Sequence, residues 1–254
     1  MTRGDVDYDA RGVPGAGYAA RRRTDPRIEA LVHRALGPAR SVVNVGAGAG
    51  SYEPSDRPVI AIEPSATMRA QRPPERAVAI AASAEHLPLE TGSVEAAMAM
   101  VTVHQWSGLE SGLREMRRVA RGPVIVLTFD PAALQRFWLS DYVPEVLASE
   151  ARRFPELGAM GEILGGAVAV LDVPVPRDCV DGFIEAYYAR PEALLDDSVR
   201  AAQSAWTFVE ASVVRRGLDR LAADLDSGAW DARYGELRTR PEYAGSLRLL
   251  VATP

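Results

Sequence analysis

A glycine-rich turn between two short apolar runs is the feature that most limits how this chain can fold. Residues 42–45 (VVNV) precede residues 46–50 (GAGAG), and residues 59–62 (VIAI) end at Glu63. Short apolar runs rich in Val and Ile are typical of buried parallel strands, and glycines let the backbone leave a strand and come close to a ligand. A carboxylate at the tip of the second strand can accept hydrogen bonds from both hydroxyls of a ribose. The pattern therefore predicts a nucleotide-type cofactor site on an α/β sheet.

The spacing of the glycines separates two kinds of cofactor. A dinucleotide-binding turn has its third glycine or alanine five residues after the first, and Ser51 stands at that position. The third glycine, Gly50, comes one residue earlier and gives the pattern G-x-G-x-G. This pattern suits a ligand that has no pyrophosphate. An oxidoreductase that binds NAD(P) on the same sheet is kept as an alternative.

Residues 44–50 (NVGAGAG) resemble the first motif of the class I S-adenosylmethionine-dependent methyltransferases. In that motif an acidic or amide residue and an apolar residue precede G-x-G-x-G; Asn44 stands where many members have an acid. The resemblance implies a Rossmann-like α/β fold with a mostly parallel seven-stranded sheet and helices on both faces. It also implies S-adenosyl-L-methionine as cofactor and S-adenosyl-L-homocysteine as product.

Three further segments are similar to the same family. Residues 83–89 look like the loop that contacts adenine after the third strand. Residues 101–106 (VTVHQW) are similar to the HxW loop of the branch that acts on small molecules, and residues 246–251 look like a closing strand. The resemblance is clear over residues 18–130, thins afterwards and returns at the closing strand.

The chain is interpreted as a single methyltransferase domain over residues 1–254. Residues 18–130 form the cofactor-binding core, residues 131–245 hold substrate-side helices and a sixth strand, and residues 246–254 form the closing strand. The long segment before the closing strand is interpreted as a helical insertion that caps the substrate side, because a hairpin partner normally follows within a few residues. Four more strands are predicted at residues 77–81, 95–100, 124–129 and 166–173.

Several residues in these motifs are predicted to bind the cofactor. The resemblance implies that Tyr18 and Arg22 close over its methionine part, where an arginine fork suits a carboxylate; a frayed basic N-terminus is the alternative. Glu85 is interpreted equally well as a helix-capping acid, and Met100 and Val101 equally well as core residues. The full set is Tyr18, Arg22, Gly46, Ala47, Gly48, Glu63, Pro64, Met68, Ser83, Ala84, Glu85, Met100 and Val101.

His104 is the only histidine near the expected pocket. It can act as a base toward a hydroxyl or amine substrate, an effect of about 10²–10⁴-fold, or it can orient its loop through a backbone hydrogen bond. Trp106, Trp138 and Tyr142 are predicted to wall an apolar substrate pocket, with core packing as the alternative for at least one of them.

The composition excludes several classes of chemistry. The chain has no lysine, so a Schiff base and a P-loop lysine are both ruled out. Cys179 is the only cysteine, which excludes an internal disulfide and zinc held by several thiolates and favours a reducing cytoplasm. His33 and His86 have no metal-ligand spacing, and no metal is expected.

The charge and hydropathy of the chain point to small-molecule chemistry. The net charge is −5, and the arginine doublets are scattered rather than gathered in the basic stripe of a nucleic-acid enzyme. No apolar run reaches membrane-spanning length. The expectation is a cytoplasmic bacterial enzyme, compatible with a homodimer, that binds neither nucleic acid nor membrane. It would transfer methyl from S-adenosylmethionine to oxygen, nitrogen or carbon of a small metabolite in secondary metabolism; a non-methylating cyclase or regulatory protein with the same cofactor is the second alternative.

Overall fold

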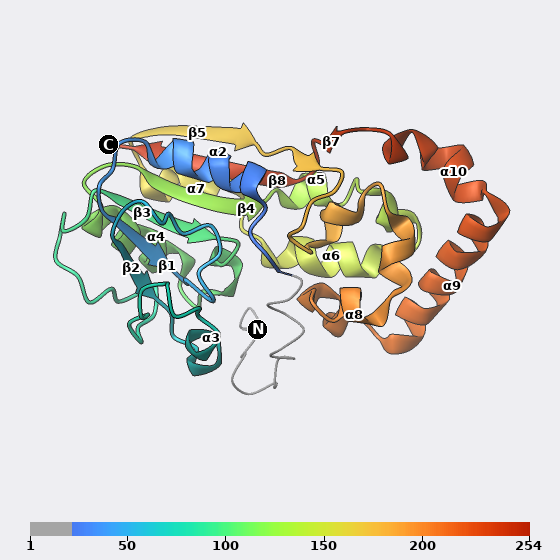
Figure 1. The fold of residues 1–254 in the computed structure, drawn as a ribbon, viewed down its shortest axis with the longest axis horizontal. Coiled ribbons are helices and arrows are strands. Elements are labelled where there is room, and N and C mark those ends of the chain that lie inside the picture. The colour runs from blue at the N-terminus through green and yellow to red at the C-terminus, as the bar shows by residue number, and fades with distance from the viewer. Residues whose placement is uncertain (1–21) are drawn as a thin grey trace.

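The computed structural model describes residues 22–254, so the predicted cofactor residue Tyr18 lies outside the described part. A six-stranded sheet forms one half of the molecule and a helical insertion the other (Figure 1). The strand order is β2-β1-β3-β4-β8-β5, and β8 runs antiparallel to the other five strands. The strands that share one direction are β1 (Val42–Val45), β2 (Val59–Ile62), β3 (Ala96–Met100), β4 (Val124–Phe129) and β5 (Ala167–Asp172); the reversed strand is β8 (Leu247–Thr253).

The mostly parallel sheet is confirmed, but its predicted count of seven strands is one too many. The predicted third strand at residues 77–81 forms a single parallel bridge, between Ile62 and Ile80. Two prolines in the preceding segment, residues 72–76, cannot donate to a ladder, and Val78 is 92% exposed. The segment therefore runs along the edge of β2 without becoming a strand.

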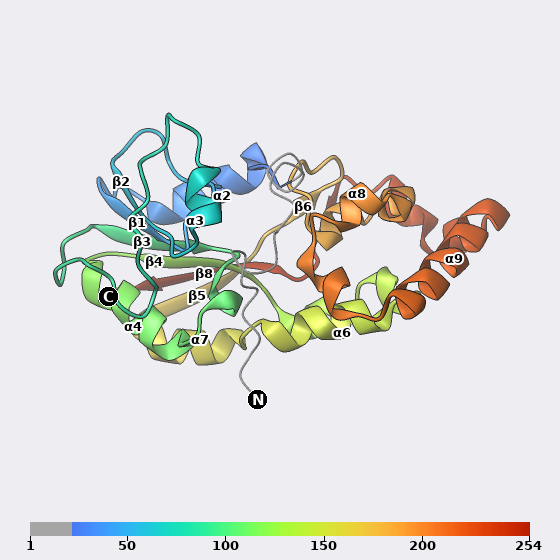
Figure 2. The ribbon, with the colours of Figure 1, turned by 90° about the horizontal axis from the view of Figure 1, so that it is seen from below.

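Helices cover both faces of the sheet (Figure 2). On one face α2 (Pro26–Leu36) packs against Ile125 and Leu127 of β4; on the other, α4 (Leu109–Val119) and α7 (Leu157–Leu164) pack against Val124 and Val126. The alternation follows from the two-residue period of a strand. α2 begins where the sequence signals a start, since the Asp25 side chain accepts the N–H of Arg27.

The insertion is a set of short helices that surround an aromatic core. The rings of Trp138 and Trp230 lie 5.4 Å apart, and the Trp138 indole donates to the Tyr188 carbonyl. Its elements are α5 (Pro131–Leu134), η2 (Trp138–Asp141), α6 (Pro144–Arg153), η3 (Ile184–Tyr187), η4 (Pro191–Leu195), α8 (Asp197–Arg200), η5 (Ser204–Phe208), α9 (Ala211–Ser227), α10 (Ala229–Tyr234) and η6 (Gly235–Arg238), with a two-stranded ribbon of β6 (Val175–Pro176) and β7 (Glu242–Tyr243).

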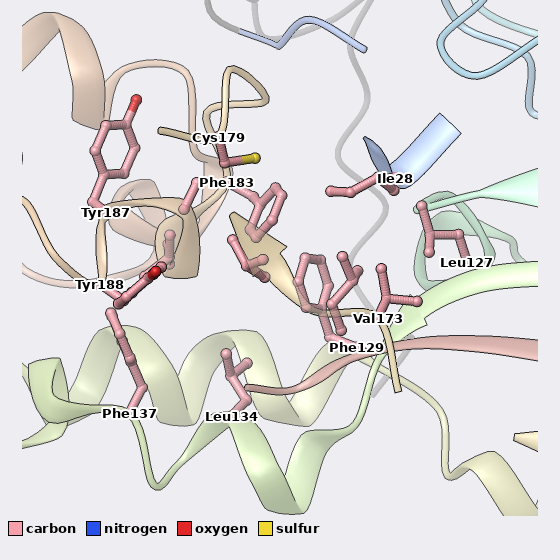
Figure 3. Close-up of a cluster of buried hydrophobic side chains, with 14 of the residues drawn as sticks. Ile28, Leu127, Phe129, Leu134, Phe137, Val173, Cys179, Phe183, Tyr187 and Tyr188 are labelled. Atoms are coloured by element: carbon pink, nitrogen blue, oxygen red, sulfur yellow. The ribbon is translucent and has the colours of Figure 1, made fainter. Parts of the chain in front are cut away.

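A buried cluster joins the insertion to the sheet. In Figure 3, Phe183 from the insertion lies near Phe129 at the end of β4, while Ile28 and Leu127 come from the sheet side. The Phe129 and Phe183 ring centroids are 5.4 Å apart. Among residues 22–254, no helix has the length and apolar character that crossing a membrane requires.

Candidate cofactor and substrate site

The glycine turn leaves β1 in a backbone conformation that only glycine adopts easily. Gly46 and Gly48 have φ values of 70° and 50°. A Cβ on Gly46 would lie 2.2 Å from Thr102 Oγ1, which is too close for any other residue. The N–H groups of Gly46 and Ala47 both donate to the Ile62 carbonyl at the end of β2. These bonds fix the turn against the strand that carries Glu63.

Glu63 lies in this turn with both carboxylate oxygens engaged. Oε2 accepts the Gly48 N–H at 2.8 Å, and Oε1 accepts the Ser65 N–H at 2.9 Å. The residue is only 7% exposed, and this burial raises its pKa despite the two hydrogen bonds. Each carboxylate oxygen can accept more than one hydrogen bond, so the group can also receive ligand hydroxyls.

A buried polar network of Asn44, Glu53 and Arg72 lies beside the turn. Asn44 Nδ2 donates to Glu53 Oε1 at 2.9 Å, and Arg72 Nη2 pairs with Glu53 Oε2 at 2.9 Å. Both charged side chains are at least 96% buried. Glu53 therefore supplies the negative charge that Asn44 lacks. No local pattern predicts this pair, because its partners meet only after the chain folds.

The turn opens onto a pocket whose mouth is open to solvent. It brings together eight predicted cofactor residues: Arg22, Gly46, Ala47, Gly48, Glu63, Met68, Met100 and Val101. Tyr52, Thr102, Gln105 and Asp181 also line it and were not predicted. Asp181 carries no motif, and only the fold brings the insertion to this position.

Four predicted cofactor residues do not line this pocket. Ala84 is buried in the core beside α4, and the Pro64 carbonyl accepts from Arg69. Glu85 accepts from the Ser107 hydroxyl and the Gly108 N–H at the start of α4. Although burial opposes it, these hydrogen bonds lower the Glu85 pKa, so the helix-capping interpretation describes this residue. Ser83, Ala84, Glu85 and Pro64 keep their cofactor roles only as proposals.

A second pocket adjoins the first and shares Arg22, Val101 and Gln105 with it. Phe129, Leu134, Phe183 and Ile184 form its apolar wall, and His104, Glu150, Glu185 and Gln203 its polar one. Val101 stands between the pockets with a φ of 52°. Left-handed backbone is strongly disfavoured for a β-branched residue and is found mainly at functional sites.

His104 lies in this second pocket in a form that carries no charge at neutral pH. Desolvation, with Arg153 and Arg22 nearby, lowers its pKa well below 6.5. Its ring packs 4.4 Å from that of Phe154, and Nδ1 has no hydrogen-bond partner among residues 22–254. A neutral imidazole can accept a proton, so the base role stays a proposal; the loop-orienting alternative would need a backbone hydrogen bond, which Nδ1 does not make within residues 22–254.

The three predicted aromatic wall residues lie away from both pockets. Trp106 packs on Gly112 of α4, and Trp138 is 4% exposed in the aromatic core of the insertion. Tyr142 donates its hydroxyl to Asp224 on α9. Phe129 and Phe183 take their place because the ends of β4 and of the ribbon converge there. Within residues 22–254, no three His, Cys, Asp or Glu side chains are grouped so that they could hold a metal ion.

Comparison with known proteins agrees with this geometry. A family profile described as a methyltransferase domain matches residues 43–127. The structure is also similar to that of a protein described as a methyltransferase from an antibiotic biosynthesis pathway of Anabaena variabilis. The two share 32% sequence identity and a TM-score of 0.85, over 93% of this chain and 100% of the other. The chain belongs to the class I S-adenosylmethionine-dependent methyltransferases. Its cofactor is S-adenosylmethionine, for which the turn, Glu63 and the first pocket provide a fitting site.

More distant structures share the fold of this methyltransferase. A phosphoethanolamine N-methyltransferase from Haemonchus contortus, in complex with S-adenosylmethionine, has 13% identity and a TM-score of 0.53, over 89% of this chain and 51% of the other. The [4+2]-cyclase SpnF has 17% identity and a TM-score of 0.50, over 89% and 79%. A comparison with proteins of curated function finds no match.

Proposed function

We propose that this methyltransferase transfers methyl from S-adenosylmethionine to an oxygen, nitrogen or carbon atom of a small metabolite held in the second pocket. The observation that carries the proposal is the contact of the two pockets at Val101, Gln105 and Arg22. An acceptor in the second pocket lies next to the cofactor. The bound cofactor supplies an electrophilic methyl group on its sulfonium, so the protein mainly positions and desolvates the reactants.

The lining residues divide this work between them. Glu63 accepts the ribose hydroxyls, Arg22 receives the methionine carboxylate, and Met100 and Val101 flank the transfer path. Phe129 and Phe183 hold the apolar part of the acceptor. His104 accepts the proton that an O–H or N–H acceptor releases as its bond to carbon forms.

Replacement of His104 tests the catalytic part of the proposal. His104→Ala should lower kcat about 10²–10⁴-fold while cofactor affinity stays within a few-fold. In the parent, kcat should stay level down to a pH well below 6.5, because the imidazole remains neutral. Arg34→Ala, at an exposed position of α2, is the control. An unchanged kcat and pH profile would show that His104 is not the base.

A methyl-transfer screen tests the reaction itself. The protein is incubated with S-adenosylmethionine carrying a labelled methyl group and with pooled bacterial metabolites, and products are read by mass. A gain of one labelled methyl on a small molecule supports the proposal. Rearranged products without the label would favour the cyclase alternative, and calorimetric binding of NAD without binding of the methyl donor would favour the oxidoreductase.

The cellular setting is part of the proposal. We infer a cytoplasmic bacterial enzyme of secondary metabolism that acts as a homodimer. The exposed edge strand β5 supports a dimer, because Val168, Val170 and Leu171 are 39–47% exposed beside an unpaired backbone edge. Sedimentation of the parent and of Val170→Lys should show a dimer and a monomer, respectively; a monomeric parent would contradict the dimer.

A further inference from the structure

Asp181 is a buried carboxylate of the insertion that faces the cofactor pocket. It is 3% exposed and lies between β6 and η3. Its Oδ1 accepts Arg22 Nε at 2.6 Å, and its Oδ2 accepts the Tyr52 hydroxyl at 2.8 Å. All three residues line the pocket. One carboxylate therefore joins the segment before α2, the glycine turn and the insertion.

The backbones at this junction are also fixed. Arg22 and Asp181 form an antiparallel β-bridge. Tyr52 has a φ of 63°, a left-handed conformation that is unfavourable for a tyrosine. Its N–H donates to Thr24 Oγ1 at 3.1 Å while its hydroxyl binds Asp181. Such a conformation persists only where the surroundings determine it. The contacts of Arg22 and Tyr52 with Asp181 are therefore a specific part of the pocket's structure.

The contact with Asp181 decides which way the Arg22 guanidinium faces. A guanidinium is planar and carries its donors in a rigid fork that matches a carboxylate. Fixing Nε against Asp181 therefore fixes the plane of the whole group. The orientation is set before a ligand arrives, which reduces the ordering that binding must impose.

We propose that Asp181 is a positioning residue that holds Arg22 in the orientation that receives the carboxylate of the cofactor's methionine part. The proposal rests on the cofactor role proposed for Arg22. It makes the affinity for the amino-acid end of the cofactor depend on the insertion. The same loop continues into Phe183 and Glu185, which line the substrate pocket, so one segment serves both pockets.

Two ligands separate this role from a general structural one. S-adenosylhomocysteine has the amino-acid end, whereas 5′-deoxy-5′-methylthioadenosine has the nucleoside and thioether without it. In calorimetry, Asp181→Asn should weaken S-adenosylhomocysteine about 10- to 100-fold and the methylthio compound by less than about 3-fold. Asp178→Asn is the matched control, because Asp178 lies in the same loop with an 80% exposed side chain; it should change neither affinity.

A second variant tests the same contact from the Arg22 side if Asp181→Asn does not fold. Arg22→Lys retains the charge but cannot contact Asp181 and a carboxylate through one rigid fork. It should show the same selective loss, and Asp181→Asn added to it should cost little more. An equal loss of both ligands, or unchanged affinity, overturns the positioning role. Failure of the parent to bind either ligand would instead overturn the cofactor site, and this proposal with it.

Discussion

The cofactor half and the insertion are held together in different ways. At the cofactor pocket the contacts involve main-chain N–H groups of the glycine turn, such as Gly46 N–H to the Ile62 carbonyl and Gly48 N–H to the Glu63 carboxylate. In the insertion they join side chains distant in sequence, such as Tyr142 to Asp224 and Trp138 to Trp230. The first kind leaves a local pattern in the sequence, and the second leaves none. The cofactor could therefore be predicted from the sequence, while the side chains that line the second pocket could not.

The largest expected effect is on the insertion. Trp230 is fully buried, so Trp230→Ala should lower the free energy of unfolding by about 3–5 kcal/mol, measured by urea denaturation. Below the transition, S-adenosylhomocysteine affinity should stay within a few-fold if the two regions differ as described. Leu195→Ala, at a 36% exposed position of the same region, should cost under about 1 kcal/mol. A similarly small cost at Trp230 would contradict the aromatic core.

The second-largest expected effect is in the cofactor half, where a substitution should lower cofactor affinity much more than stability. Glu63→Ala removes the proposed ribose acceptor and should weaken cofactor binding by roughly 2–4 kcal/mol, about 30- to 1,000-fold. Because the Gly48 and Ser65 N–H groups also lose their acceptor, unfolding should become easier by about 1 kcal/mol. Glu75→Ala, on the exposed loop before residues 77–81, is the control. Parent-like cofactor affinity would refute the ribose role.

The smallest expected effect is on stability, at the contact between the insertion and the sheet. Glu185 of the insertion accepts from the Ser246 N–H and hydroxyl just before β8, and burial raises its pKa to about 7. The folded protein thus keeps this proton up to about pH 7, whereas the unfolded chain releases it near 4.5. Its contribution to stability is complete below pH 4.5 and is lost as the pH rises through 7.

Replacing this carboxyl removes the titration. Relative to the parent, Glu185→Gln should gain about 1–3 kcal/mol of stability as the pH rises across that window, measured by denaturation at several pH values. Glu236→Gln, at an exposed site, is the control. A constant difference between parent and Glu185→Gln would show that the buried carboxyl does not titrate there.

The sequence alone determined the sheet and the glycine turn, and its resemblance to a known family determined the cofactor. The sheet and the turn follow from short-range patterns: apolar runs form buried strands, and glycines mark where the chain must adopt a positive φ. The sheet strands β3, β4, β5 and β8 lie where they were predicted. Residues 77–81 make one bridge to β2 instead of a ladder, because strand pairing depends on how neighbouring segments pack, which a short apolar run does not show.

Only the tertiary structure decided which side chains meet in the substrate pocket. Trp138 and Tyr142 are as aromatic in sequence as Phe129 and Phe183, yet the first two pack inside the insertion and the last two line the pocket. Asp181 reaches Arg22 across 159 positions of the chain, and no local pattern marks such a pairing. The physical reason is that burial and hydrogen bonding between distant segments depend on how the elements pack, which the period of a strand or a helix does not specify.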